Sequence, residues 1–258
     1  MKRIVDLNSD LGEGFGLWTM GDDACILQYV TSANIACGFH AGDPQTMLRT
    51  VQGAHERKAA VGAHPGYPDL AGFGRRPMSC SPEDVYAFCL YQIGALAAVC
   101  RAEGVSLCHV KPHGALYTQS SIDHRLAAAV AHATHDAAPD LILLGLAGTE
   151  HEVAAREVGV RFAAEVFADR AYMPDGSLMS RSRTGSVLDD PVTVAARALQ
   201  IVEDGTVEAE GGVLIAVQAD SICLHGDNPA ACRIAAAVRD ILNEAGVRLR
   251  PLREVLSR

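Results

Sequence analysis

The stretch SLCHVKPHG, residues 106–114, begins as an apolar, β-prone run and ends in polar side chains. Lys111 stands there between His109 and His113, although only three of the 22 basic residues in the chain are lysines. In parallel α/β folds, ligands bind beyond the carboxyl ends of buried strands, which is where such polar residues lie. The fold therefore depends on whether this pattern recurs along the chain.

The pattern does recur, with a helical segment after nearly every apolar run. Alternating strands and helices are typical of a parallel sheet covered by helices, and the length suits one closed barrel. An open, doubly wound sheet is the alternative. We expect a single α/β domain over residues 1–258, with a (β/α) barrel architecture. Strands or β-rich runs are predicted over residues 3–8, 32–37, 59–64, 106–114, 140–146, 161–169, 211–217 and 220–227, and helices over residues 22–30, 43–58, 81–104, 122–136, 150–159, 191–205 and 228–245.

Two of the predicted helices carry clear boundary signals. Asp43 is placed to cap the second helix, with Pro44 in its first turn. Ser81 is the predicted cap of the third helix, and Gly104 is its predicted stop. The longest irregular stretch, residues 174–190, is rich in Gly, Ser and Arg and is predicted to be a mobile loop.

The composition excludes several classes of protein. Hydrophobic residues make up 49% of the chain, which is ample for a large buried core. A net charge of −9 without a basic stripe disfavours a nucleic-acid or anionic-membrane partner. The N-terminus lacks the apolar core of a signal peptide, and no apolar run approaches the roughly 20 residues of a membrane helix. We therefore expect a cytoplasmic protein.

The eight cysteines and the short motifs narrow the chemistry further. The chain has no CxxC pair, which argues against a structural zinc site. A P-loop and a GxSxG nucleophile elbow are absent, and GEGFG at residues 12–16 lacks the GxGxxG spacing of a dinucleotide site. Five cysteines in apolar surroundings are expected to be reduced and buried: Cys37, Cys89, Cys100, Cys108 and Cys223.

Polar residues collect at the ends of the predicted strands. Because the carboxyl ends of parallel strands meet at one mouth of a barrel, we expect these side chains to form a ring there. The following positions make up this set: Asp6, Asn8, Asp10, Glu13, His40, Asp43, His64, Asp69, Arg75, Arg76, Lys111, His113, Glu165, Asp169, Arg170, His225 and Asp227.

A ring of this kind could hold a divalent metal. Two histidines and a carboxylate leave positions open for water, and Asp10, His40 and His64 are the natural trio, with His113 as a substitute. A metal-free polar pocket is the alternative. Lys111 in such a pocket could bind a carboxylate or phosphate, or act as a base.

Six segments, taken together and in order, resemble the LamB/YcsF family, whose members are 5-oxoprolinase A subunits. The resemblance covers the chain from about Asp6 onward. It implies an irregular (β/α) barrel of the glycoside hydrolase/deacetylase type. The segments are DLNSDLGEGFG (6–16), NIACGFHAGD (34–43), AHPGYPDLAGFGRR (63–76), HVKPHGALY (109–117), EVFADRAY (165–172) and CLHGD (223–227).

The resemblance also implies an activity and partners. The activity is ATP-dependent opening of the 5-oxoproline lactam to L-glutamate, with ATP as co-substrate together with Mg²⁺. The enzyme would work as a complex with 5-oxoprolinase subunits B and C. The lactam amide is unreactive, so we expect phosphorylation of its oxygen, attack by water and ring opening.

The chemistry suggests a role for each candidate residue. Such a site needs a base, cations for phosphate and carboxylate, and donors for developing negative charge. We expect Lys111→Ala to fold normally and to lose about 100- to 1000-fold in turnover. Asp10 or Glu13 would activate water or hold a metal, Lys111 and Arg170 would stabilise phosphoryl charge or clamp the substrate carboxylate, His113 would protonate the leaving nitrogen, Asp169 would orient Arg170, and Asn8, His40, His64, Arg75 and His225 would bind the substrate.

Two other functions stay open at this point. A metal-dependent deacetylase or amidohydrolase would need no ATP and would bind a metal tightly. A non-catalytic substrate-binding subunit would leave the chemistry to its partners, and the absence of a P-loop keeps this alternative in view.

Overall fold

Seven parallel strands form a closed barrel in the computed structural model, which describes residues 3–226 and 229–257. The last strand of the barrel pairs with both its sixth and its first strand, so the sheet has no free edge in this ring. The barrel prediction is therefore confirmed, and the open doubly wound sheet is excluded. In order around the barrel, the strands are β1 (Ile4–Leu11), β2 (Ser32–Ala36), β3 (Ala60–His64), β4 (Leu107–Val110), β5 (Ile142–Leu146), β6 (Arg161–Phe167) and β9 (Ser221–Cys223).

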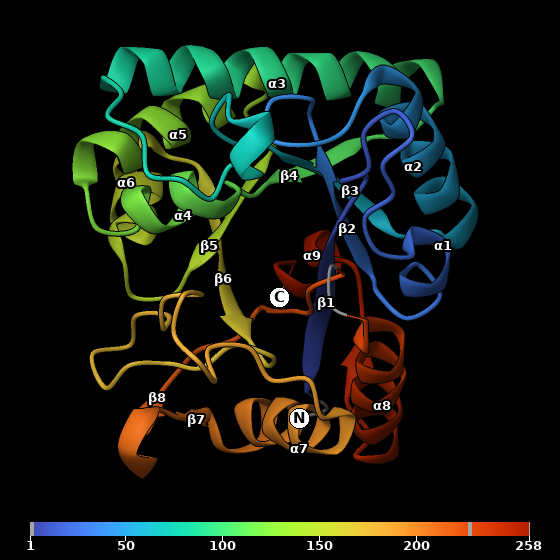
Figure 1. Cartoon of the computed structure of the whole chain (residues 1–258), viewed down its shortest axis with the longest axis vertical. Coiled ribbons are helices and arrows are strands. Elements are labelled where there is room, and N and C mark those ends of the chain that lie inside the picture. Colours follow the sequence, from blue (N-terminus) through green and yellow to red (C-terminus); the bar gives the residue numbers. More distant parts are fainter. Residues whose placement is uncertain (1–2, 227–228, 258) are drawn as a thin grey trace.

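Helices surround the barrel, and the longest of them, α3, lies along one side of the molecule (Figure 1). Helix α5 packs against both α3 and α6. On the side of the molecule opposite α3, α7 packs against α8. The helices are α1 (Asp23–Ile26), α2 (Pro44–Arg57), α3 (Pro82–Ala102), α4 (Gly114–Ser120), α5 (His124–Ala137), α6 (Glu150–Val158), α7 (Pro191–Asp204), α8 (Ala231–Glu244) and α9 (Leu252–Val255), with short 3₁₀ turns at η1 (Leu70–Gly72) and η2 (Glu210–Gly212).

The helix boundaries follow the predicted caps. The Asp43 carboxylate accepts hydrogen bonds from the first backbone N–H groups of α2, and Pro44 is its first residue. Ser81 forms a reciprocal capping box at the start of α3, and Gly104 adopts a positive φ of 69° just past its end. These local signals are independent of tertiary packing, so the sequence alone was enough to find them.

Strict alternation of strands and helices breaks down in three places. In the segment predicted as helix 22–30, the helix α1 covers residues 23–26 alone. The strand predicted over residues 106–114 ends at Val110, and α4 begins four residues later, at Gly114. The β-rich run 211–217 lies outside the barrel, where β8 (Leu214–Ala216) pairs antiparallel with β7 (Thr206–Glu208); a short β10 (Arg248–Leu249) pairs with the start of β1.

Helix α3 has the length and apolar character of a membrane span. It is instead part of the packed core, because residues of one helical stripe are buried against the barrel and α5. That stripe includes Val85, Cys89, Ile93, Leu96 and Cys100.

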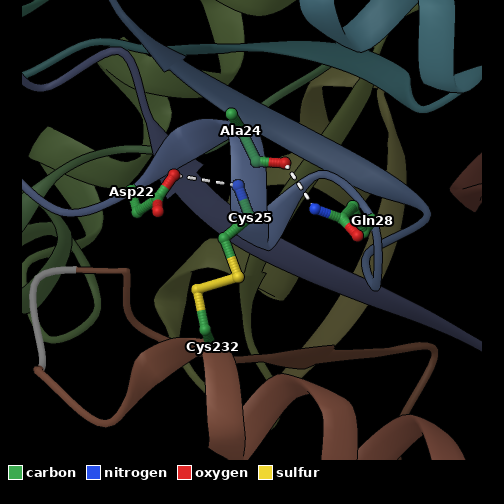
Figure 2. The surroundings of a disulfide bond; sticks show 5 residues. All are labelled: Asp22, Ala24, Cys25, Gln28 and Cys232. Atoms are coloured by element: carbon green, nitrogen blue, oxygen red, sulfur yellow. Dashed lines mark hydrogen bonds between the residues drawn. A yellow bond between two sulfur atoms is a disulfide. The ribbon is translucent and has the colours of Figure 1, made fainter.

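A disulfide joins Cys25 of α1 to Cys232 of α8, across 207 residues of chain (Figure 2). The pair leaves no local spacing signal in the sequence, because its two cysteines lie so far apart in the chain. The five cysteines expected to be reduced and buried are indeed buried and free.

Candidate active site

The interior of the barrel is polar along its axis, unlike an ordinary hydrophobic barrel core. Asp6, Asn8 and Asp10 alternate along β1 and therefore point to the same, inner side. Asp6 and Asn8 are fully buried. Polar side chains from β2, β4, β6 and β9 meet them and build a connected column toward the mouth.

The lowest layer of this column is centred on Asp6. Its carboxylate accepts hydrogen bonds from the hydroxyl groups of Thr31 (2.7 Å), Ser32 (2.6 Å) and Ser221. Burial raises the pKa of Asp6 to about 6, and the three hydroxyl donors oppose that rise without cancelling it.

The middle layer joins two asparagines and a histidine. The Asn34 amide donates to Oδ1 of Asn8 at 2.7 Å and to Oδ1 of Asp10 at 2.8 Å. The Nε2 atom of His109 lies 2.6 Å from Oδ1 of Asn34. Gly62 of β3 makes room for this ring, because a Cβ there would lie 2.1 Å from His109 Nε2.

The upper layer holds Lys111 between two carboxylates. Its Nζ atom lies 2.9 Å from Oδ1 of Asp10, 2.8 Å from Oε1 of Glu165 and 3.2 Å from Sγ of Cys223. Burial alone would lower the pKa of Lys111, but Asp10, Cys223 and Glu165 together raise it well above its usual value. The side chain is therefore a fixed ammonium ion, which argues against a role for Lys111 as a general base.

Three histidines and a glutamate form a second cluster beside this layer. His113 stacks on His40 with ring centroids 3.7 Å apart, and its Nδ1 atom lies 2.9 Å from Nε2 of His64. The Oε1 atom of Glu13 lies 3.5 Å from His113 Nδ1 and 3.8 Å from His40 Nε2. Burial and the neighbouring histidines lower the pKa values of His40 and His113 well below the usual range, so both rings are neutral at pH 7.

A cavity of about 490 Å³ opens above both clusters. Its floor includes Asp10, Glu13, His64, Lys111 and His113. Its wall is formed by the loop between β6 and α7, which carries Arg170 and Arg181, together with Arg75. Carboxylates, imidazoles and cations therefore converge on one space large enough for a small substrate.

The predicted loop 174–190 is irregular and forms part of this wall. The guanidinium of Arg170 donates to the backbone oxygens of Met179 (2.6 Å) and Ser186 (3.1 Å). Burial lowers the pKa of Arg170 to about 10, still well above neutrality. The first role of Arg170 in the structure is thus to hold the loop over the cavity.

Asp169 does not orient Arg170, contrary to the sequence expectation. Its carboxylate accepts from the backbone N–H of His225 at 2.8 Å and lies 2.9 Å from the Nδ1 atom of that ring. Burial would raise the pKa of Asp169, but His225 outweighs it and lowers that pKa below the usual range. The chain bends directly after β6, and there Asp169 binds His225 while Arg170 binds the loop backbone.

The structure brings together all eleven predicted site residues. Asp10, Glu13, His64, Arg75, Lys111, His113, Arg170 and His225 line the cavity, whereas Asn8, His40 and Asp169 lie buried directly behind it. Arg76 turns away and pairs with Asp69, and Asp227 lies outside the described residues.

Several residues at the site had no predicted role. Glu165 belongs to the set of strand-end residues but had no assigned role. Its inward position near the end of β6 is the signal that could have identified it as the partner of Lys111. Tyr117 also lines the cavity, from α4, a helix that was not predicted from the sequence; the residue belongs to the segment HVKPHGALY, which is the signal that could have found it. Arg181, Asn34 and Cys223 complete the set.

A larger hollow of about 740 Å³ lies on the outer side of β6. None of the eleven predicted site residues lines it, and its lining includes Arg156 of α6 and Ile215 of β8. Size alone is therefore a poor guide to the site in this molecule, and the chemistry favours the cavity at the barrel mouth.

The protein is classified first by its fold, a closed parallel barrel with a polar mouth. The fold is shared with a solved T48 deacetylase (TM-score 0.53, 13% identity, 99% of this chain and 92% of that chain) and with the peptidoglycan deacetylase PdaC from Bacillus subtilis (TM-score 0.51, 12% identity, 98% and 91%). At these identities the likeness concerns the fold alone.

The LamB/YcsF family model matches residues 5–257, and the chain belongs to that family. The 5-oxoprolinase A subunit from Pyrococcus abyssi is 51% identical over 98% of this chain and 99% of its own length. A 5-oxoprolinase A subunit of Pseudomonas syringae pv. tomato is 50% identical over 96% and 97%. A solved lactam utilization protein from Thermus thermophilus superposes with a TM-score of 0.91 at 50% identity, covering 96% of this chain and 99% of that chain.

Proposed function

We propose that the chain is the A subunit of an ATP-dependent 5-oxoprolinase, which opens the lactam of 5-oxoproline to give L-glutamate. The observation that carries the proposal is identity of about 50% over nearly the full length of relatives that bear this name. A name that specifies one lettered subunit implies others, and we take these to be subunits B and C. The complex would work in the cytoplasm.

The reaction begins with a poor electrophile. Transfer of the γ-phosphoryl group of ATP to the lactam oxygen releases ADP and leaves a phosphorylated imidate. Water then adds to the ring carbon, and the ring C–N bond breaks while the nitrogen gains a proton, which leaves an acyl phosphate. A second water molecule hydrolyses this acyl phosphate, so that 5-oxoproline, ATP and two waters give glutamate, ADP and phosphate.

The arginines of the cavity wall are suited to the substrate carboxylate. Arg75, Arg170 and Arg181 all line the same space, and guanidinium groups bind carboxylates and phosphates through paired donors. In this scheme Arg170 has a double role, because two of its N–H groups hold the loop while the group faces the cavity.

The floor supplies the acid–base groups. Two residues there are candidates to activate water. Burial would raise the pKa of Asp10, but His64 and Lys111 lower it far below the usual range, so Asp10 is a carboxylate. A carboxylate so strongly stabilised is a weak base, which favours Glu13 for that role. The neutral His113 ring, with its Nδ1 atom 3.5 Å from Oε1 of Glu13, would relay the proton that Glu13 takes from the attacking water to the leaving nitrogen.

Lys111 acts in this proposal as a fixed positive charge. It lies between the carboxylates of Asp10 and Glu165 before the substrate binds, and it stabilises negative charge that develops above it. Asn8 keeps Lys111 in place from below, with its Oδ1 atom 3.3 Å from Nζ. His225 would contact the substrate from the opposite wall, with its ring orientation set by Asp169.

ATP enters the proposal as a co-substrate with Mg²⁺. The chain carries no P-loop, so the nucleotide would bind through an unfamiliar site here or on one of the partners. Phosphoryl transfer needs cations at the β- and γ-phosphates, and the cavity arginines supply three near the substrate.

The test is glutamate formation from 5-oxoproline and ATP, with ADP followed in parallel. The protein is assayed alone and then with subunits B and C from the same host. Glutamate and ADP that appear together only with all three subunits support the proposal. A confirmed, folded complex that forms neither product overturns it.

One observation favours a second function, a metal-dependent hydrolase acting on an amide or acetyl group without ATP. Glu13, His40, His64 and His113 are buried and offer donor atoms within 4.8 Å of one another. This candidate predicts hydrolysis that is independent of ATP and is lost on chelation, which the same assay distinguishes when ATP is omitted.

A further inference from the structure

The rings of His64 and His113 at the cavity floor face each other, each through one ring nitrogen. The Nδ1 atom of His64 lies 2.8 Å from the backbone oxygen of Lys111, and the Nε2 atom of His113 lies 2.8 Å from the backbone oxygen of Phe73. A carbonyl oxygen only accepts, so both of these ring nitrogens carry hydrogen. The inward atoms, His64 Nε2 and His113 Nδ1, are then lone-pair donors when the rings are neutral.

These two inward atoms lie 2.9 Å apart. Two lone pairs at that distance repel each other, so the arrangement is stable only with a positive charge in reach of both. Carboxylates surround the same point, because Asp10 Oδ2 lies 3.2 Å from His64 Nε2 and Glu13 Oε1 lies 3.5 Å from His113 Nδ1. The negative surroundings favour a cation there.

His40 adds an independent observation. It is fully buried, and neither of its ring nitrogens has a hydrogen-bond partner among residues 3–226 and 229–257. A buried imidazole without a partner loses the hydrogen bonds that water would give it, which costs free energy. Its Nε2 atom is directed toward Glu13 at 3.8 Å, so a bound cation would satisfy it.

We propose that His40, His64, His113 and Glu13 form a binding site for one divalent first-row transition metal ion, of the zinc class. Their donor atoms all lie within 4.8 Å of one another. Three imidazoles and one carboxylate suit zinc and its neighbours, whereas calcium and magnesium prefer oxygen ligands. The carbonyl partners of His64 and His113 fix the rings in the way that outer hydrogen bonds fix metal-bound histidines.

The local backbone is shaped for these rings. A Cβ on Gly66 would lie 2.6 Å from Nδ1 of His40, and a Cβ on Gly74 would lie 2.7 Å from Cβ of His40. Gly74 also has a positive φ of 61°, which side chains rarely adopt. The two glycines thus allow the stacked pair of His40 and His113 to sit against the backbone.

This donor set differs from the trio of Asp10, His40 and His64 expected from the sequence. Asp10 accepts from Lys111 at 2.9 Å, so its charge is already compensated, while Glu13 and His113 face the histidine cluster. The inference goes beyond the proposed lactam reaction, and metal binding is measured without turnover. With an ion bound, Glu13 and His113 act as its ligands and do not take or relay the proton of the attacking water.

The experiment is metal analysis of the full-length protein. The chain is stripped with a chelator, dialysed against micromolar Zn²⁺ and, separately, Co²⁺, and its metal content is measured by mass spectrometry. We expect one ion per chain and, with Co²⁺, visible absorption typical of histidine ligation. In Glu13→Gln and His113→Gln we expect affinity to fall at least about 10- to 100-fold, the loss typical of removing even an outer-shell partner.

Two control variants make the result specific. Asp22→Asn removes the carboxylate of a second group of potential donors, Asp22, Cys25 and Cys232, while its two cysteines stay joined in the disulfide, and this variant should leave the ion bound. His132→Gln changes an exposed histidine and should also leave it bound. Circular dichroism verifies that each variant is folded. A wild-type chain without stoichiometric metal, or folded Glu13→Gln and His113→Gln variants that retain it fully, would overturn the proposal, and neither result bears on lactam opening.

Discussion

The Nζ atom of Lys111 lies 2.8 Å from the Oε1 atom of Glu165, and both side chains are buried inside the barrel. Lys111 follows β4 and Glu165 lies in β6, so the pair reaches across the intervening strand β5. Together with Asp10, the pair makes the ionic centre of the site. Removal of Lys111 leaves both carboxylates without compensation in a region that excludes water, whereas removal of one carboxylate leaves Lys111 paired with the other.

The first prediction concerns this centre. The substitution Lys111→Met leaves Asp10 and Glu165 unpaired, and breaking a buried ion pair in this way lowers the free energy of unfolding by about 3–5 kcal/mol. The structure therefore adds a stability loss to the expectation of normal folding. Turnover of the assembled complex should also fall about 100- to 1000-fold. Guanidinium denaturation and glutamate formation measure the two effects.

A double variant separates stability from activity. Lys111→Met combined with Glu165→Gln removes one charge of each sign, so it should regain part of the lost stability without regaining turnover. Lys58→Met, at an exposed lysine after α2, should behave as wild type. Wild-type stability in the single Lys111→Met variant would contradict the ionic centre described above.

The second prediction is a pH dependence of stability that originates in Asp6. Its pKa is about 6 in the folded chain against a usual 3.8, so folding favours the protonated form. The stabilising contribution is fully present below pH 3.8 and is lost as the pH rises through about 6. Between pH 4 and 7 the free energy of unfolding of the wild type, relative to Asp6→Asn, should fall by roughly 3 kcal/mol. Parallel pH profiles for the two proteins would show that Asp6 is not responsible.

The third prediction concerns the cross-link between Cys25 and Cys232. A bridge that closes 207 residues stabilises the fold by restricting the unfolded chain, with an upper value of about 5 kcal/mol in the chain-entropy account. Dithiothreitol should therefore lower the denaturation midpoint of the wild type. The Cys232→Ser variant should begin at the lower value and show no response. Identical wild-type midpoints with and without reductant would count against a stabilising bridge.

The fourth prediction uses two glycines as a matched pair. Gly66→Ala places a methyl group 2.6 Å from Nδ1 of His40, so the ring must move off its stack with His113 and turnover of the complex should fall. Gly94→Ala, in α3, meets no atom within 4 Å and should keep full activity while gaining up to about 1 kcal/mol of stability. Equal activity in both variants would show that the His40 position is not critical.

The sequence was most informative where local rules apply. The caps at Asp43 and Ser81 were found because capping depends on neighbouring residues. The ring of strand-end residues was found because parallel strands bring their carboxyl ends to one place. In both cases the geometry follows from chain order alone.

Other features depend on contacts between residues far apart in the chain, which the spacing of residues in the sequence does not reveal. The partner of Asp169 is His225, 56 residues further along the chain, and the bridge of Cys25 spans almost the whole chain. Glu165 was placed at the correct mouth, but its pairing with Lys111 depends on the direction in which each strand turns its side chains. The outward β7–β8 hairpin was missed because its apolar pattern matches that of a barrel strand.

Closure of the barrel between β1 and β9 has a consequence for synthesis of the chain. β1 is the first barrel strand to leave the ribosome and β9 is the last, so one edge of the growing sheet stays unpaired until residue 223 has emerged. Asp10 and Lys111 are made long before the strand that encloses them. A chain that terminates prematurely would thus leave the edges of both β1 and β6 unpaired, with the risk of aggregation, and would not form a smaller closed barrel.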